Sequence, residues 1–302
     1  MSTVGTTYVV GYTADARGAE AVALAASIAG GSATTLVLAI ILPEHTPFDA
    51  VYPGTDQGYD TILGDTVSTW AAEALALVPR HIAARVVVRS APSEAEGLMS
   101  IAAETHADTI VVGTQRRGLA GRFTVGSVAT ALLHSSPVPV LLAPAGAAVP
   151  APEGPGRVTA FAGNRPGAAA VIRTAAAAAV RRGIPLRVVS LLDMDLRQND
   201  AGARAELTRE TEEAIASVVT SLGVLADVVV AAGDSVEDAV NALDWAPDEV
   251  AVVGSSRLAR KHRLFLGSTA QRMLRVLPVP MIVVPRGYKP PALRTRAARQ
   301  EP

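Results

Sequence analysis

The sequence predicts an α/β protein made of two tandem halves, each an open five-stranded parallel sheet with helices on both faces. The first observation is a gapless repeat, because Asp108–Pro144 recurs as Glu249–Pro285 at a constant offset of 141 positions. The second is composition: 49% of the 302 residues are apolar and only 4% aromatic, as in parallel sheets filled by Val, Leu, Ile and Ala. The third is the alternation of strand and helix patterns, which indicates crossover connections and parallel strands.

In the first half, short apolar runs alternate with helical patterns. Gly30 and Gly31 end the first helix, and Pro43 ends the second strand. Residues 44–65 show no period and read as a long surface excursion, which fits a functional loop and a plain crossover equally well. The predicted strands cover 7–13, 35–42 and 84–89, and the predicted helices cover 19–28, 66–78 and 99–105.

The second half repeats this order. Ser93 and Glu96 have the spacing of a capping box, in which the serine oxygen accepts from the helix N-terminus and the glutamate reaches back. Asp234 and Glu237 stand 141 positions later and predict a second box. The predicted strands of this half cover 157–162, 186–192 and 227–232, and its predicted helices cover 168–181 and 203–222.

The repeat also predicts the domain boundaries. We expect one domain over 1–146 and a second over 157–287. The Pro- and Gly-containing residues 147–156 are expected to form a semi-extended linker, and the basic residues 288–302 a disordered tail.

Each repeat consists of a buried strand, a loop that begins with glycine, a helix that opens at Gly-Ser and a strand introduced by Pro-Val-Pro. In parallel sheets, ligands bind beyond the carboxyl ends of the strands. The free N–H groups and the dipole of a helix N-terminus stabilise an anion there, by about 0.3–1 kcal/mol for the dipole. Arg116, Arg117 and Arg122 lie in the first loop and suit phosphate oxygens. A capped helix beside a solvated loop explains the same pattern equally well.

Several function classes are excluded or disfavoured. Leu119 stands where a Walker A loop requires lysine, and neither G-x-G-x-x-G nor G-x-S-x-G occurs. There is no cysteine, and the histidines lack metal-ligand spacing. We therefore expect no metal site and no enzyme. Carboxylates near predicted strand or helix ends could act as a base or hold Mg²⁺, but capping and solubility explain them better: Asp15, Glu20, Asp193 and Asp195.

Charge and hydropathy bear on partners and location. The formal net charge of −1 removes the bulk electrostatic case for binding nucleic acid. The apolar run 36–42 is far shorter than the ~20 residues that cross a bilayer, and the N-terminus lacks the pattern of a signal peptide. We expect a cytoplasmic protein without membrane or nucleic-acid partners.

The loops carry a resemblance to the universal stress protein family, whose nucleotide-binding members have G-x2-G-x9-G-[ST] after the fourth strand. This chain has Gly113, Arg116 and Gly126-Ser127 at that spacing, and Gly254, Arg257 and Gly267-Ser268 in the second half. It is identified as a tandem member. The resemblance implies an adenine nucleotide alpha hydrolase-like, Rossmann-like fold, a role in the stress response, and an adenine nucleotide ligand of the ATP, ADP or AMP class, with or without Mg²⁺.

The resemblance also implies which residues would form the sites. The family's nucleotide binders carry an aspartate after the first strand, where this chain has Thr13, which can still hydrogen-bond, and Ala162, which cannot. Ile40 and its counterpart Leu191 are implied to lie against the base. The expected nucleotide site of the first half comprises Tyr12, Thr13, Ile40, Val112, Gly113, Thr114, Arg116, Arg117, Gly126, Ser127 and Val128, and a weaker site in the second half comprises Ala162, Gly163, Leu191, Gly254, Ser255, Arg257, Gly267 and Ser268.

A second function stays open. Arg116 and Arg257 replace the motif's second glycine in both halves, and an arginine there either reaches a phosphate or fills its space. The alternative is therefore a member without nucleotide binding that acts as a protein-interaction or dimerisation module. The resemblance implies that the last strands, 137–143 and 278–284, pair across the domain interface. This pairing would make the two domains a pseudo-dimer, and a homodimer of whole chains is a further possibility.

Overall fold

The computed structural model describes residues 5–30, 33–44, 56–113, 126–142, 153–163, 167–193, 201–256 and 264–289, with the backbone alone for 56–63, 201 and 204. The first half contains β1 (Thr6–Gly11), α1 (Ala16–Ala29), β2 (Thr34–Pro43), α2 (Asp56–Ala76), β3 (Ala83–Ala91), α3 (Glu94–Glu104), β4 (Thr109–Val112), α4 (Ser127–Ser135) and β5 (Val140–Leu142). The second half contains β6 (Arg157–Phe161), α5 (Ala168–Arg182), β7 (Leu186–Asp193), α6 (Ala201–Ser221), β8 (Asp227–Gly233), α7 (Val236–Asn241), β9 (Glu249–Gly254), α8 (Ser268–Met273) and β10 (Met281–Val284).

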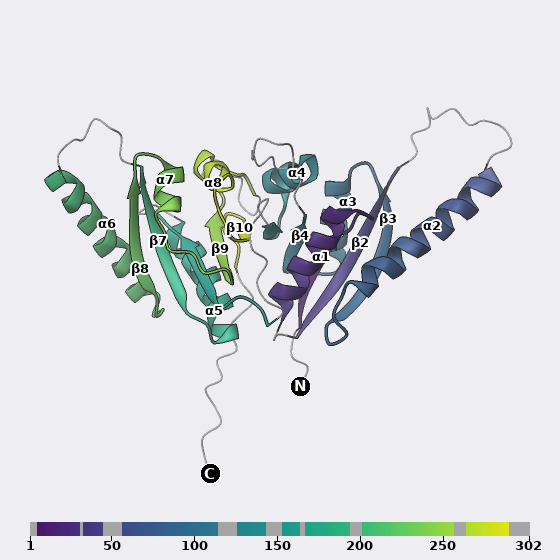
Figure 1. Cartoon of the computed structure of the whole chain (residues 1–302), viewed down its shortest axis with the longest axis horizontal. Helices are drawn as coiled ribbons and strands as arrows, with labels where there is room; N and C mark the ends of the chain where they lie inside the picture. The colour runs from purple at the N-terminus through teal and green to yellow at the C-terminus, as the bar shows by residue number, and fades with distance from the viewer. Residues whose placement is uncertain are drawn as a thin grey trace, which may run out of the picture.

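All ten strands form one sheet, in the order β3-β2-β1-β4-β5-β10-β9-β6-β7-β8. Neighbouring strands are parallel within each half. At the centre β5 and β10 pair antiparallel, with Leu141 opposite Ile282, and the two halves lie on either side of this seam (Figure 1). The predicted pairing of the last strands is confirmed. It joins the two expected five-stranded sheets into one, because each half leaves its β5-type edge unpaired.

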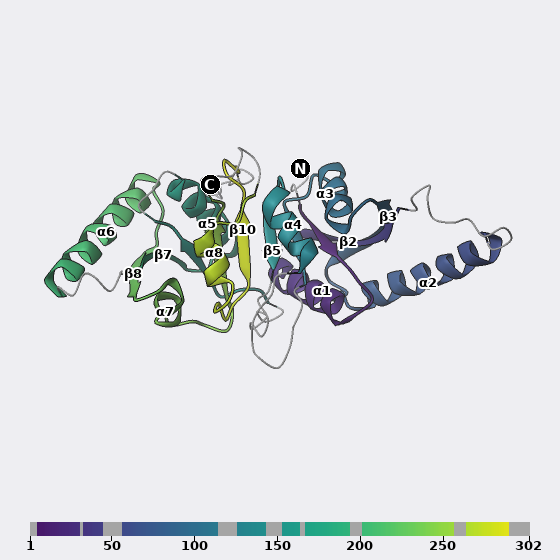
Figure 2. The ribbon, with the colours of Figure 1, turned by 90° about the horizontal axis from the view of Figure 1, so that it is seen from above.

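The helices cover both faces of the sheet, as predicted. On the face of α3, α4, α7 and α8, one hydrophobic core runs across the seam and includes Leu98, Leu132, Val240 and Met273. On the other face the core divides into a cluster beneath α1 and α2 and a cluster beneath α5 and α6. Ile282 of β10 packs against both. Seen from above, β5 and β10 lie side by side at the middle while α2 and α6 lie at the outer ends (Figure 2).

Two local predictions need correction. Helix α2 begins at Asp56, ten residues before the predicted start. The apolar residues Tyr59, Ile62 and Leu63 have helical spacing, but the glycines and aspartates between them are poor helix formers and concealed it. The second capping box is shifted by one residue. The N-cap of α7 is Ser235, whose hydroxyl accepts from Asp238 N–H, while Glu237 pairs instead with Arg272 of α8 at 2.7 Å. The first cap is as predicted, since Ser93 Oγ accepts from Glu96 N–H at 3.2 Å.

Some expectations stay untested. Most of the predicted linker and nearly all of the tail lie outside the described residues, as do 45–55 of the predicted excursion. The domain boundaries at 146 and 157 therefore stay predictions. None of the helices in the described ranges is long and apolar enough to span a membrane.

Candidate functional site

The carboxyl ends of β1 and β4 meet at one edge of the sheet, because these strands pair directly, with Val10 opposite Val111. Helices α1, α3 and α4 all begin at this edge. Between them lies an open hollow of about 460 Å³ with an inner volume of about 50 Å³. Its lining includes the predicted residues Thr13, Val112, Gly113, Gly126, Ser127 and Val128, and also Gly11, Arg17, Glu94 and Ala129, which the sequence did not single out.

Helix α4 presents an open N-terminus to this cavity. Its N-cap is Gly126, in extended conformation, and no side chain among the described residues caps its first turn. Ser127, the first helical residue, is exposed. The first N–H groups of a helix have no partner within the helix, and they carry the positive end of its dipole. The start of α4 can therefore accept an anion without displacing any side chain among the described residues.

Helix α1, in contrast, is already capped by an acid. Asp15 Oδ1 accepts from the N–H groups of Arg17 and Gly18 and from Thr13 Oγ1 at 2.7 Å. Its Oδ2 pairs with the Arg17 guanidinium at 2.5 Å. Partial burial raises the pKa of Asp15, but the hydrogen bonds from Arg17, Thr13 and Gly18 outweigh it and lower the pKa to about 2. The hydroxyl of Thr13 is thus committed as a donor to Asp15, and its oxygen remains as an acceptor.

Glu94 is the carboxyl among the described residues that line this cavity. Burial raises its pKa, Arg17 opposes that shift and Asp15 reinforces it. A negative ligand therefore meets Arg17 and Glu94 at this end of the cavity, with Asp15 paired to Arg17. The α4 end carries only backbone groups and the Ser127 hydroxyl among the described lining residues.

Two glycines bring the loop after β1 against the end of β4. A Cβ on Gly113 would lie 2.2 Å from Arg17 O, and a Cβ on Gly18 would lie 1.9 Å from Thr13 O. Both distances are far below van der Waals contact with backbone atoms that cannot rotate away. Gly113 is therefore required by packing, whether or not a ligand binds beside it.

Other predicted residues of the first half lie elsewhere. Tyr12 and Ile40 are 6% and 3% exposed and belong to the core beneath α1 and α2, so their side chains do not line this cavity. Thr114, Arg116 and Arg117 fall outside the described residues, and their roles stay predictions.

The corresponding loop of the second half is closed on itself. Ser255 Oγ accepts from Phe265 N–H at 2.8 Å, and Ser256 N–H donates to Phe265 O at 2.8 Å. A Cβ on Gly267 would lie 3.3 Å from Ser256. The hydrogen-bonding groups of Ser255 and Ser256 that could otherwise contact a ligand are thus engaged with Phe265.

The remaining residues predicted for this half lie in different surroundings. Ala162 is buried, Leu191 packs against the shared core, and Gly254 lies beside Val171. Gly163 and Ser268 are exposed, and Arg257 lies outside the described residues.

The closed loop contacts the first half. Leu264 N–H donates to Ser136 O at 3.0 Å, and the Phe265 ring meets the His134 ring edge to face, with centroids 5.1 Å apart. His134 and Ser136 lie at the C-terminal end of α4. The second loop therefore helps to hold the helix whose other end faces the first-half cavity.

Sequence reasoning favoured capping for Asp15, and Asp15 does cap α1. It missed the pairing of Asp15 with Arg17 and the acid Glu94. Asp15 directly precedes an Ala-rich helix and Glu94 directly follows the N-cap Ser93, which are helix-start signals that place both at the carboxyl edge of a parallel sheet. Within the described ranges no group of three or more His, Asp or Glu side chains is arranged to hold a metal ion.

Comparison with known proteins agrees with this architecture. A family model described as the universal stress protein family matches residues 7–144 and 157–285. A universal stress protein of Mycobacterium tuberculosis strain H37Rv is 29% identical over 293 residues, which cover 92% of this chain and 99% of the relative.

Two solved structures show the same fold. A universal stress protein from Archaeoglobus fulgidus covers 94% of this chain and 100% of its own at 16% identity, with a TM-score of 0.64. A functionally unknown protein from Pseudomonas aeruginosa covers 94% of this chain and 93% of its own at 17% identity, with a TM-score of 0.60. Since the family model matches both halves of the chain, this protein belongs to the universal stress protein family as a tandem, two-domain member.

Proposed function

We propose that the protein is a cytoplasmic stress-response protein that binds an adenine nucleotide in the cavity of its first half and acts by binding rather than catalysis. The observation that carries this proposal is the start of α4, which opens into that cavity at Gly126 with no side-chain cap. A phosphate group placed there would receive backbone N–H bonds and the helix dipole.

The lining residues would contact different parts of the nucleotide. Ser127 and the first N–H groups of α4 would hold the phosphates, and Thr13 would accept a hydrogen bond from the sugar through the lone pair that Asp15 leaves free. Glu94 and Arg17 are the charged side chains among the described lining residues, and Arg17 is paired with Asp15. Mg²⁺, where present, would arrive with the phosphates, because hard oxygen ligands and waters suit it.

The second candidate is an interaction protein without a nucleotide. The closed loop of the second half favours it, since Ser255, Ser256 and Phe265 satisfy one another and the loop packs on α4 across the seam. The pseudo-dimer of the two halves would then be the functional surface, alone or in a homodimer of whole chains.

Equilibrium titration with ATP, ADP, AMP and cyclic AMP, each with and without Mg²⁺, separates the two candidates. Nucleotide binding predicts saturation with one site per chain for at least one compound. Lack of saturation by all four at a concentration on the order of 1 mM, a binding free energy of only about −4 kcal/mol, would exclude the first candidate and leave the second.

A further inference from the structure

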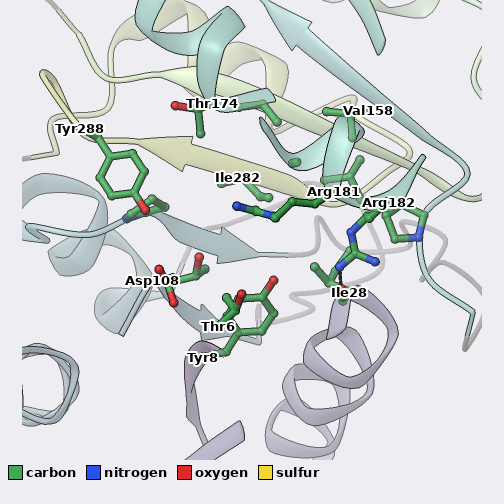
Figure 3. A pocket seen from close by; sticks show the side chains of 16 residues that line it. Thr6, Tyr8, Ile28, Asp108, Val158, Thr174, Arg181, Arg182, Ile282 and Tyr288 are labelled. Atoms are coloured by element: carbon green, nitrogen blue, oxygen red, sulfur yellow. Dashed lines mark hydrogen bonds between the residues drawn. The ribbon is translucent and has the colours of Figure 1, made fainter. Parts of the chain in front are cut away.

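A second cavity lies at the opposite edge of the sheet from the candidate nucleotide site. It spans the seam, between the amino ends of β1, β4, β6 and β9 and the C-terminal ends of α1 and α5. Its inner volume is about 80 Å³ within a partly open hollow of about 740 Å³, and a single buried water needs only ~10–15 Å³. Figure 3 shows side chains of both halves lining it.

The cavity exists because the core is interrupted there. On this face the clusters beneath α1 and α5 remain separate, whereas the core on the other face is continuous across the seam. The space between the two helices is left to side chains of both halves. Cavities at domain interfaces are frequent places for small ligands.

Arg182, at the end of α5, links the two halves at this point. Its guanidinium donates to Gly30 O at 2.9 Å and to Ile28 O, which are carbonyl groups at the C-terminal end of α1. A cation at a helix C-terminus satisfies free carbonyls and the negative end of the dipole. Arg182 is therefore engaged in structure.

Arg181, its neighbour, is not engaged in this way. Its side chain extends along Ile282 toward the side of the cavity that holds Tyr288 and Asp108, while Arg182 turns toward Ile28 (Figure 3). Across the described part of the chain, no protein acceptor forms a hydrogen bond or ion pair with Arg181. Arg181 is exposed and lines the apolar cavity, and its five N–H donors have no acceptor among the described protein groups, so it presents a ready site for a carboxylate or phosphate.

The other polar groups support a donor-rich site. Burial raises the pKa of Tyr8 and raises the pKa of Tyr288 to about 12, so both phenols keep their protons and can donate. Burial also raises the pKa of Asp108, whose Oδ2 accepts from Thr7 N–H at 2.9 Å. The described charged lining residues are Arg181, Arg182 and Asp108, which leaves one net positive charge for a monoanion to balance.

We propose that this seam cavity, hereafter the seam site, binds a small organic acid whose acidic group pairs with Arg181 and whose aliphatic or aromatic body lies on the apolar wall. That wall is formed by Ile28, Pro139, Val158, Val250, Val252 and Ile282. Because residues of both halves contribute, occupancy would also stabilise the contact between the two halves. The seam site is independent of the proposed nucleotide site.

The test uses the whole chain and three probes: benzoate, its neutral amide benzamide, which has the same size, and acetate, which keeps the charge but lacks the ring. We expect benzoate to bind in ligand-detected NMR or calorimetry with a Kd on the order of 1 mM, a reasonable value for so few atoms. Benzamide and acetate should bind at least about tenfold more weakly, because one lacks the charge and the other lacks the body.

Two variants locate the site. Arg181→Gln should weaken benzoate binding about tenfold or more, since a charge-assisted hydrogen bond is lost. Ala178→Phe, on the lining face of α5, should abolish binding by filling the space while leaving Arg181 in place. The matched controls are Arg173→Gln and Val180→Phe, at exposed positions on the same helix, and neither should change the Kd.

The outcomes are distinct from those of the nucleotide titration. Lack of saturable benzoate binding below about 10 mM, equal binding of benzamide, or unchanged affinity in both Arg181→Gln and Ala178→Phe would overturn the seam site. Retained nucleotide binding in Arg181→Gln would show that the two sites are separate, whereas its loss together with folding would show that Arg181 is structural, which also contradicts the proposal.

Discussion

The two halves of this chain share one fold but treat the same positions differently. Asp108 and Glu249 occupy the same place in the repeat, at the start of β4 and β9. Glu249 is fully buried and pairs with Arg157 at 2.6 Å and Arg187 at 2.7 Å, whereas Asp108 binds a backbone N–H and faces the seam cavity. The segments after these strands also differ: Ser255 and Phe265 are hydrogen-bonded to each other after β9, whereas the start of α4 after β4 has no side-chain cap among the described residues.

In the second half these repeated positions form internal contacts, whereas in the first half they lie beside cavities. In the second half the acid is neutralised, Trp245 stacks on Arg187 with its ring centroid 5.2 Å from the guanidinium, and the loop is closed by Ser255 and Phe265. In the first half the acid lies beside a cavity and the start of α4 is open.

Removal of the charge on Glu249 should have the largest effect. Glu249→Gln leaves Arg157 and Arg187 without a counter-ion in the interior, and breaking a buried ion pair costs about 3–5 kcal/mol. The measurement is the free energy of unfolding in urea. Asp108→Asn, the matched change in the first half, should cost less than about 1 kcal/mol, because an amide oxygen can still accept from Thr7 N–H.

Equal losses from the two substitutions would contradict the division between the halves. Because the ion-pair network lies in the second half, Glu249→Gln should destabilise that half more than the first. Amide hydrogen exchange resolved by residue would then report faster exchange in β6, β7 and β9 than in β1 and β4.

Gly113 and Gly254 occupy the same position in the two repeats and allow a second comparison of the halves. Gly113→Ala should destabilise the chain by about 2–3 kcal/mol, because its Cβ would lie 2.2 Å from a fixed backbone oxygen. Gly254→Ala should cost about 1 kcal/mol, because its Cβ would meet Val171 Cγ2 at 2.6 Å, and a side-chain methyl can shift further than backbone. Thermal unfolding of both variants checks the order, and a larger loss for Gly254→Ala would show that the first loop is the looser one.

The N-cap glycines of α4 and α8 allow the same comparison of the two halves, with nucleotide affinity as the measured quantity. Gly126→Val should weaken nucleotide binding about tenfold or more, since a branched side chain would cover the first N–H groups of α4. Gly267→Val should leave nucleotide affinity unchanged, because Ser256 and Phe265 already close that loop. Calorimetry measures the nucleotide affinity of both variants. Retained binding in Gly126→Val would place the ligand elsewhere.

Much of this architecture follows from periodicity, and the rest depends on contacts that periodicity does not encode. The strands and most helices were predictable because a gapless repeat and buried apolar runs specify them, whereas the pairing of the last strands was implied by the family resemblance. The start of α2 was not predicted, because the glycines and aspartates of residues 56–65 are poor helix formers. The shift of the cap from Asp234 to Ser235 depends on which acid finds a partner, and Glu237 is drawn to Arg272 on a helix remote in sequence.

The same division holds for the candidate site. Gly113, Gly126 and Ser127 were predictable because backbone geometry at a strand end demands particular residues. The seam cavity was not, since Arg181, Asp108 and Tyr288 come from both halves and meet only through the antiparallel pairing of β5 and β10. Patterns in a single sequence carry no information on contacts between residues that are far apart in the chain.

The smallest predicted effect concerns acid and the cap of α1. Because the pKa of Asp15 is lowered to about 2 from an ordinary value of 3.8, its charge stabilises the folded state above about pH 4, and this contribution is lost as the pH falls toward 2. The Asp15 side chain is 40% exposed, so solvent screening limits the contribution to about 1 kcal/mol or less. Asp15→Asn keeps an oxygen to cap the helix and removes only the charge.

Unfolding of the wild type and Asp15→Asn between pH 2 and pH 6 measures this contribution directly. The wild type should be more stable at pH 6, and the two curves should converge near pH 2, where Asp15 becomes protonated. The matched control is Asp227→Asn at the exposed start of β8, which should follow the wild type throughout. The start of α5 has no such acid, since its N-cap is Gly167 without a side-chain bond. A constant gap between the wild type and Asp15→Asn down to pH 2 would therefore mean that capping geometry, and not charge, distinguishes the first helix of the two halves.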